Sequence, residues 1–168
     1  MLIGVISDTH GLIRPEALAA LQESDLIIHA GDIGDLAVLE ALEAIAPVIA
    51  VKGNIDKREW AKKLPDVRVV EADSARIYVI HSLEELKIDP VVESFQMIIY
   101  GHSHIPSVRE QDGVIYLNPG SAGPRRFNLP VSVARAEVSM AEIDVRIVRL
   151  EIGAKAMKKK LDHLFRES

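Results

Sequence analysis

Short apolar segments recur along the first hundred residues of the chain, and none of them alternates between apolar and polar positions. They are rich in isoleucine and valine, and they are Leu2–Ile6, Leu26–Ile28, Val48–Val51, Ile77–Ile80 and Met97–Tyr100. Strands covered on both faces lose the alternation of half-exposed strands, so we expect buried strands here. Pro15–Gln22 and Leu36–Ala44 have helical spacing, and Asp35 is the expected N-cap of the second. This βαβαβ order predicts a parallel or mixed sheet with helices outside.

The second half of the chain carries hairpin signals instead. Three pairs of segments are separated by turn residues: Val67–Val70 and Arg76–Ile80 around Glu71–Ser74, Ser107–Gln111 and Val114–Leu117 around Asp112-Gly113, and Val131–Val138 and Glu142–Leu150 around Ser139-Met140. We therefore expect two packed sheets, the first mostly parallel and the second richer in antiparallel pairs. A basic helix is expected at about residues 154–166.

Composition narrows the class of protein. No Pro/Gly/Ser-rich linker divides the 168 residues, so we expect a single domain over 1–168. The net charge of −5 is not the overall positive charge that is typical of proteins that bind a nucleic-acid polymer or a membrane surface. There is no cysteine, which excludes thiolate metal sites, disulfides and a cysteine nucleophile. The first residues do not have the pattern of a signal peptide and no apolar run is long enough to cross a membrane, so we expect a cytoplasmic protein.

Polar side chains follow each of the five expected buried strands. They are Asp8, His10, Asp32, Asn54, His81, His102 and His104. Sites in open α/β sheets form beyond the carboxyl ends of the strands, so these side chains should meet at one edge. Gly31, Gly53 and Gly101 precede or lie between them, and we expect these glycines to permit sharp turns.

This set of oxygen and imidazole donors suits divalent transition metals such as Mn, Fe, Co, Ni or Zn. Seven ligands are too many for one tetrahedral ion and fit two ions that share a carboxylate. Two such cations can hold a phosphate between them together with an activated hydroxide, so no protein nucleophile is needed. The sequence agrees, because no serine lies in a G-x-S-x-G turn.

The ordered motifs resemble those of the calcineurin-like metallophosphoesterase superfamily. They are Asp8-Thr9-His10, Gly31-Asp32, Gly53-Asn54, His81 and Gly101-His102-Ser103-His104, and Asn118-Pro119-Gly120-Ser121 extends them. Within the superfamily the chain is similar to the small bacterial and archaeal phosphodiesterases of the YfcE type. The resemblance implies an α/β fold, a four-layer αββα sandwich of two mixed sheets flanked by helices. It also implies hydrolysis of phosphate esters with two divalent ions, manganese first, with iron, nickel, cobalt and zinc as alternatives.

The resemblance also implies a role for each residue. The first metal would be held by Asp8, His10 and His104, and the second by Asn54, His81 and His102. Asp32 would lie between the two ions and bind both. The candidates for direct participation in catalysis are Asp32, Asn54 and His102. The candidates for contact with the substrate phosphate are Asn54 and Arg125.

The sequence departs from the family pattern at two places. Ile55 and Asp56 follow Asn54, where many relatives carry a histidine that donates a proton, so we expect a preference for good leaving groups and for diesters over alkyl monoesters. Ser82-Leu83 follows His81 where relatives often have Gly-His. We expect Asp56 to be the N-cap of a helix over Lys57–Lys63, with a role in proton transfer as the alternative.

Several alternatives stay open at this stage. His29 is interpreted as a buried residue that orients metal carboxylates rather than as a ligand. The same metal site would also serve a phosphomonoesterase, and the retromer subunit Vps29 resembles this fold but is a non-catalytic interaction scaffold with a degenerate metal site. The expected partner is a small phosphate ester, and the apolar side of the C-terminal helix could support a homo-oligomer.

Overall fold

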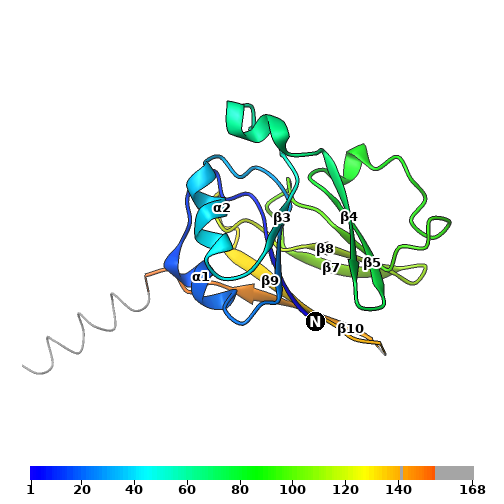
Figure 1. Ribbon diagram of the computed structural model, residues 1–168. Coiled ribbons are helices and arrows are strands. Elements are labelled where there is room, and N and C mark those ends of the chain that lie inside the picture. Colours follow the sequence, from blue (N-terminus) through cyan, green and yellow to red (C-terminus); the bar gives the residue numbers. More distant parts are fainter. Residues whose placement is uncertain (141, 154–168) are drawn as a thin grey trace, which may run out of the picture.

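Two five-stranded sheets lie face to face in the computed structural model, which describes residues 1–140 and 142–153 (Figure 1). The first sheet has the order β10 (Ile143–Arg149), β9 (Ser132–Val138), β1 (Leu2–Ile6), β2 (Leu26–His29), β3 (Val48–Ala50). The second has the order β4 (Val67–Ala72), β5 (Ala75–Ile80), β6 (Met97–Ile99), β8 (Val114–Asn118), β7 (Ser107–Gln111).

Both sheets are mixed, as expected for this fold class. In the first sheet β1, β2 and β3 are parallel, while β9 is antiparallel to β1 and β10. In the second sheet β5, β6 and β8 are parallel, and the edge strands β4 and β7 are antiparallel to their neighbours. The expected contrast between the sheets was wrong, because the β9–β10 hairpin extends the first sheet. Turn chemistry in the sequence predicts a hairpin but not the sheet that it joins.

Two α-helices cover the outer face of the first sheet (Figure 1). The helix α1 (Pro15–Ala20) begins at a proline, whose fixed φ suits a first helical turn. The helix α2 (Leu36–Glu43) is capped by Asp35, whose side chain accepts a hydrogen bond from the Ala37 N–H at 3.0 Å, which confirms the predicted cap. Leu21 and Leu42 are fully buried against this face of the sheet.

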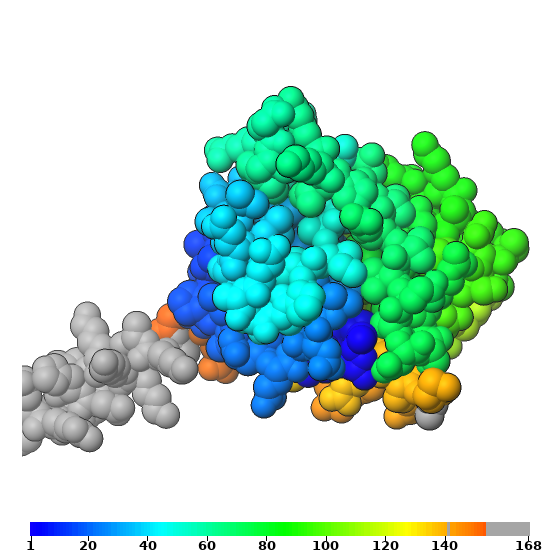
Figure 2. Space-filling model, in the orientation of Figure 1, coloured from blue at the N-terminus to red at the C-terminus, as the bar shows by residue number. Residues whose placement is uncertain are grey.

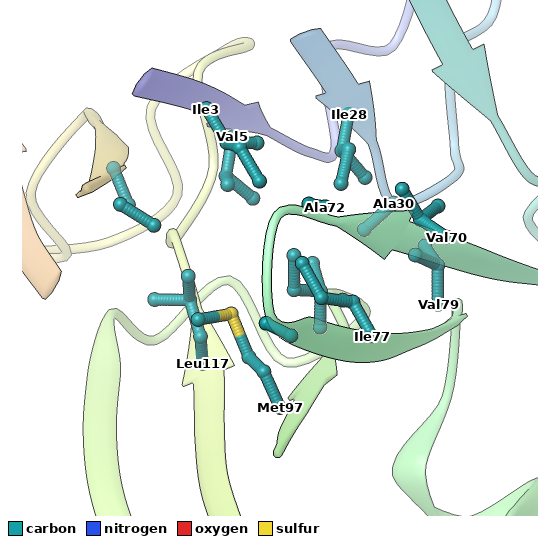
Figure 3. Close-up of a cluster of buried hydrophobic side chains, with 14 of the residues drawn as sticks. Ile3, Val5, Ile28, Ala30, Val70, Ala72, Ile77, Val79, Met97 and Leu117 are labelled. Atoms are coloured by element: carbon teal, nitrogen blue, oxygen red, sulfur yellow. The ribbon is translucent and has the colours of Figure 1, made fainter. Parts of the chain in front are cut away.

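The main core lies between the two sheets (Figure 3). Ile3 and Val5 of β1 meet Ile77 of β5, Met97 of β6 and Leu117 of β8, and all five are fully buried. Each such side chain stabilises the fold by about 1.5–3 kcal/mol relative to exposure. Because helices cover the other face of β1 and β2, these strands are buried on both sides. Their sequences therefore show no alternation.

The outer face of the second sheet has a thinner cover. Ile80, Phe95, Ile98 and Val114 form a small cluster there, with the 3₁₀ turn η2 (Leu83–Glu85) and the irregular segment 86–96 over it. Within residues 1–140 and 142–153, no α-helix lies on this face. The sandwich of two mixed sheets is confirmed, and its fourth layer consists of turns rather than of a regular helix.

Local differences from the sequence predictions are small. The segment after Asn54 forms a 3₁₀ helix, η1 (Glu59–Lys63), shorter than the expected helix. Pro65 follows closely and favours an extended Leu64. The β4–β5 connection is shorter than expected, because β4 continues to Ala72. The predicted helix at 154–166 lies outside the described residues. No helix among the described residues has the length and apolar character needed to cross a membrane.

Candidate metal centre

The expected site residues meet at one end of the sandwich, where strands of both sheets terminate. Backbone hydrogen bonds continue past the strand ends: the N–H of Asp8 donates to the Gly31 carbonyl at 3.0 Å, and that of His10 to the Asp32 carbonyl at 3.0 Å. In the second sheet the Gly101 N–H donates to the His81 carbonyl at 2.9 Å. The loops are therefore held in register by the chain itself before any side chain contributes.

The backbone is left-handed at most of the expected ligands. The φ values are 54° at Asp8, 49° at His10, 54° at Asp32, 68° at His102 and 60° at His104. Positive φ is uncommon outside glycine, although Asp, Asn and His tolerate it best. Such strained residues cluster at functional sites, where the fold holds side chains in arrangements that an unstrained loop does not reach.

The glycines of the motifs act in two ways. Gly31 has a φ of 96°, so it fits the expected sharp turn. Gly53 has no such φ, and its requirement is space, because a Cβ there would lie 2.1 Å from Oδ1 of Asp32. A side chain at Gly53 would displace a candidate metal ligand.

Asp8, His10 and His104 form the first group of donor atoms. Nε2 of His10 and Nε2 of His104 face each other at 3.3 Å, and Nε2 of His104 lies 3.3 Å from Oδ1 of Asp8. Asp8 is fully buried, yet its Oδ1 accepts no hydrogen bond, and Nδ1 of His104 has no hydrogen-bond partner either. A buried carboxylate oxygen without a partner is costly, and a cation among these three donors would satisfy it.

Asp32, Asn54 and His81 form the second group. Nε2 of His81 lies 3.4 Å from Oδ1 of Asp32 and 3.1 Å from Oδ1 of Asn54. Nδ1 of His81 donates to the Ala30 carbonyl at 2.7 Å. A carbonyl only accepts, so the hydrogen is on Nδ1, and in the neutral ring Nε2 keeps its lone pair toward the site. Asp32 also extends Oδ2 toward His10, at 3.8 Å from its Nε2, and so lies between the two groups.

His102 lies on the open side of this cluster. It is exposed, whereas His81 and His104 are buried. Its ring centroid is 5.2 Å from that of His81, and its backbone N–H donates to Oδ2 of Asp8 at 3.1 Å. Asn54 is exposed as well. The structure thus brings all seven expected ligands together, with Asn54 and His102 at the solvent side.

Charge is distributed so that the site accommodates a cation. Burial alone would raise the pKa of Asp32, but hydrogen bonds from His81 and the Ile55 N–H outweigh it, and the pKa is lowered. Burial would lower the pKa of His81, but hydrogen bonds to Asp32 and the Ala30 carbonyl raise it. Burial lowers the pKa of His10 despite the attraction of Asp32 and Asp8. A metal ion binds the neutral imidazole and displaces any proton that it carries, so an ionised carboxylate with nearby imidazoles is a donor set that divalent transition metals accept.

Among the described residues, two sets of donors are close enough to hold ions: Asp8, His10 and His104, and Asp8, Asp32 and His81. Within each set the ligand atoms lie within 4.8 Å of one another. The sets share Asp8 and are linked again by Asp32. The residues present therefore fit a pair of neighbouring divalent cations. Their donor atoms are of the right types, and a cation would give Oδ1 of Asp8 the partner that it lacks.

His29 and Thr9 support the loop that carries Asp8 and His10. Nδ1 of His29 accepts from the Gly31 N–H at 3.2 Å, so its Nε2–H donates to Oγ1 of Thr9 at 2.9 Å. Complete burial lowers the pKa of His29 to about 4, and the ring is neutral. The interpretation of His29 as a buried residue beside the site fits this arrangement.

The side chains of Asn118 and Ser121 donate hydrogen bonds to the loops that carry the candidate ligands. The Asn118 side chain donates to the Gly101 carbonyl at 2.8 Å and to Oγ of Ser103 at 3.1 Å, within the loop of His102. Oγ of Ser121 donates to the Asp8 carbonyl at 2.9 Å. The motif at 118–121 lies beside the site, and its side chains fix the neighbouring loops.

The expected role of Asp56 as a helix N-cap was wrong. The N-cap of η1 is Arg58, which makes no side-chain cap bond, and Asp56 lies outside this helix. The Asp56 carboxylate instead accepts hydrogen bonds from three backbone N–H groups of the site loops. No local signal announces this role, because two of the donors lie more than twenty residues earlier in the chain.

A cleft of about 550 Å³ opens beside the solvent side of the cluster. Asn54, His81 and His102 form one part of its lining, and Lys52 and Lys57 contribute to the rest. The cleft lies between the segment that leads into η1 and the segment of η2, which are at the same end of the molecule (Figure 2, turquoise and green). It gives a small molecule direct access to the candidate ligands.

The expected substrate arginine lies elsewhere. Arg125 is exposed and lines a separate cavity of about 430 Å³ with Asn128 and Arg149. Arg126 is the arginine whose charge contributes to lowering the pKa of His10. Arg14 donates to the Gly123 carbonyl at 3.2 Å. Contact of Arg125 with substrate stays a prediction.

Residues 1–141 match the model of the calcineurin-like phosphoesterase superfamily domain. The chain belongs to this superfamily. It is 37% identical over 161 residues to a probable metallophosphoesterase of Methanothermobacter thermautotrophicus, covering 89% of this chain and 92% of that protein. It is 30% identical over 139 residues to a phosphodiesterase of Methanocaldococcus jannaschii, covering 71% and 83%. The predicted family is confirmed, and its relatives support a metal-dependent hydrolase of phosphoester bonds.

Solved structures of the superfamily share the fold. An archaeal phosphodiesterase matches with a TM-score of 0.72 and 26% identity, covering 88% of this chain and all of that one. Vps29 of Entamoeba histolytica, complexed with Zn²⁺, matches with a TM-score of 0.71 and 24% identity over 89% of this chain and 98% of its own. The second likeness shows the common sandwich alone.

Proposed function

We propose that this chain is a dimetal phosphodiesterase. The observation that carries the proposal is the convergence of Asp8, His10, His104, Asp32 and His81, whose donor atoms form two overlapping groups within 4.8 Å. In this proposal Asp8, His10 and His104 hold one ion, and Asn54, His81 and His102 hold the other. Asp32 contacts both, because its two oxygens already lie toward His81 and His10.

Divalent ions supply Lewis-acid charge to a phosphoryl oxygen and lower the pKa of water. The protein's part is to hold their ligands and admit the substrate. The Ala30 carbonyl fixes the ring of His81, and the His102 N–H fixes Oδ2 of Asp8. Asn54 turns Oδ1 toward His81, which leaves its amide N–H groups for a phosphate oxygen in the cleft. Asp32, Asn54 and His102 are thus the proposed catalytic residues.

The leaving group decides between diesters and monoesters. The position after Asn54 is Ile55, a half-exposed apolar side chain that has no proton to give. We therefore expect the enzyme to prefer esters whose leaving oxygen needs no protonation. Phosphomonoesterase activity at the same site is the second candidate, because it would use the same metal ligands.

The proposal is tested with purified protein, bis-p-nitrophenyl phosphate and p-nitrophenyl phosphate, each with Mn²⁺, Fe²⁺, Co²⁺, Ni²⁺ or Zn²⁺. We expect turnover of the diester, a smaller kcat/KM for the monoester, and loss of both after chelation. A larger kcat/KM for the monoester would favour the second candidate. A folded protein that binds none of these metals and turns over neither ester would support a scaffold of the Vps29 kind.

Finer features belong to the same proposal. Manganese is the metal we expect to give the highest kcat, and the YfcE type is the expected subgroup. We also propose a cytoplasmic location, one domain over 1–168 and assembly into a homo-oligomer. Analysis of the metal in protein prepared without added metal tests the expectation of manganese. The mass of the protein in solution tests the homo-oligomer.

A further inference from the structure

A single buried carboxylate joins the loops that follow β2 and β3. Asp56 is 6% exposed. Its Oδ2 accepts from the Ile33 N–H at 3.1 Å and from the Gly53 N–H at 2.8 Å, and its Oδ1 accepts from the Gly34 N–H at 2.9 Å. Both oxygens are therefore used to bind backbone. Charge-assisted bonds of this kind are roughly twice as strong as neutral ones.

Two of the three donors are immediate neighbours of candidate ligands. Ile33 follows Asp32, and Gly53 precedes Asn54. The bonds from Ile33 and Gly53 end on the same oxygen, so Oδ2 of Asp56 fixes the distance between the two loops. The placement of Asp32 relative to Asn54 consequently depends on Asp56, together with the direct bond from the Ile55 N–H to Oδ1 of Asp32 at 3.1 Å.

The third bond extends this control to the loop after β1. Gly34 lies so close to that loop that a Cβ on it would come within 2.6 Å of the His10 carbonyl carbon. The Gly11 N–H also donates to the Ile33 carbonyl at 2.7 Å. A shift of residues 33–34 would therefore move the backbone of His10.

We propose that Asp56 is a positioning residue of the metal centre, which sets the spacing of Asp32, Asn54 and His10 through backbone bonds. The inference rests on the proposed function. The three N–H bonds occupy three of the roughly four acceptor positions of the carboxylate, so a positioning role fits Asp56 better than proton transfer. Loss of such supporting partners typically costs about 10–100-fold in metal affinity or activity.

The test compares wild type, Asp56→Asn, Asp56→Glu and Asp35→Ala. Asn keeps the size of Asp56 but presents an NH₂ group to backbone N–H donors, so the loops must move apart. Glu keeps the charge and the acceptors but places them one methylene farther out, so its effect on the loops should be smaller than that of Asn but not zero. Asp35→Ala is the matched control: Asp35 also accepts a backbone N–H, from Ala37, but it caps α2 and lies at the surface.

Mn²⁺ titration by calorimetry on metal-free protein gives stoichiometry and Kd, and kcat and KM on bis-p-nitrophenyl phosphate follow. For Asp56→Asn we expect a Kd raised by about tenfold or more at one or both sites and a kcat lowered by about 10–100-fold. KM should change little, and Asp56→Glu should recover part of both losses. Asp35→Ala should lose stability and keep the wild-type Kd and kcat.

An Asp56→Asn protein with wild-type Kd and kcat would overturn the proposal. If Asp56→Asn does not fold, Asp56→Glu decides: an unchanged Kd and kcat despite the longer side chain would also overturn it, and a raised Kd with cooperative unfolding would support it. Failure of the proposed function appears differently, as wild-type protein that binds Mn²⁺ and turns over no ester. The calorimetric comparison of the variants then still stands.

Discussion

The two sides of the metal centre differ in how they are held. Asp8, His81 and His104 are between 0% and 4% exposed, and backbone or buried side chains surround them. Asn54 and His102 are exposed and line the cleft. The buried side is built as part of the core, while the exposed side is where a substrate would reach ions held by the candidate ligands. Fixed ligands and accessible ligands thus lie within a few ångströms of each other, and the fold separates them by burial alone.

The largest expected effect comes from the carboxylate between the two sides. Asp32→Asn keeps the shape of the side chain but removes the charge shared by the two ions, so we expect kcat/KM to fall by about 10³-fold. Steady-state kinetics on bis-p-nitrophenyl phosphate measures this. Asp25→Asn, at the start of the same strand β2, is the control and should stay active. An active Asp32→Asn enzyme would refute the shared role.

The next largest effect is the pH dependence of stability on the buried side of the site. Burial lowers the pKa of His29 to about 4, below its ordinary value of 6.5. As pH falls below 6.5 His29 takes up a proton first in the unfolded chain, so its contribution to the free energy of unfolding falls between about pH 6.5 and 4 and levels off below. The difference amounts to roughly 3 kcal/mol.

Urea unfolding of wild type and His29→Asn in EDTA, from pH 4 to 7, measures this contribution, since other groups cancel in the difference. Asn keeps an oxygen to accept the Gly31 N–H. We expect the variant to lose less stability on acidification than wild type. Parallel curves would mean that His29 is accessible to protons in the folded state.

The smallest effect compares one histidine from each side. His81→Ala leaves the Ala30 carbonyl without its partner in a buried position, so we expect a loss of about 2 kcal/mol in the free energy of unfolding. His102→Ala changes an exposed side chain and should cost less than about 0.5 kcal/mol. Both should lower kcat. Equal stability losses, measured by urea unfolding in EDTA, would show that the two sides are not held differently.

The sequence predicted the buried strands and all seven converging residues, because strand ends and ligand motifs are local patterns. It could not predict Asp56, whose backbone donors at Ile33 and Gly34 are distant in sequence and carry no side-chain signal. It also placed the β9–β10 hairpin in no particular sheet, since register across β1 depends on the packing of Ala134 and Ala136 in the core. The turn layer over Phe95 depends on packing in the same way.

The ligands come from both sheets, and this has a consequence for folding. Asp8, His10, Asp32 and Asn54 follow strands of the first sheet, while His81, His102 and His104 follow strands of the second. Neither sheet alone carries either proposed ligand set, so tight metal uptake begins only when the two have docked. An ion held there adds its binding free energy to the association of the two halves of the molecule, and the rate of metal capture during refolding would report on that final assembly step.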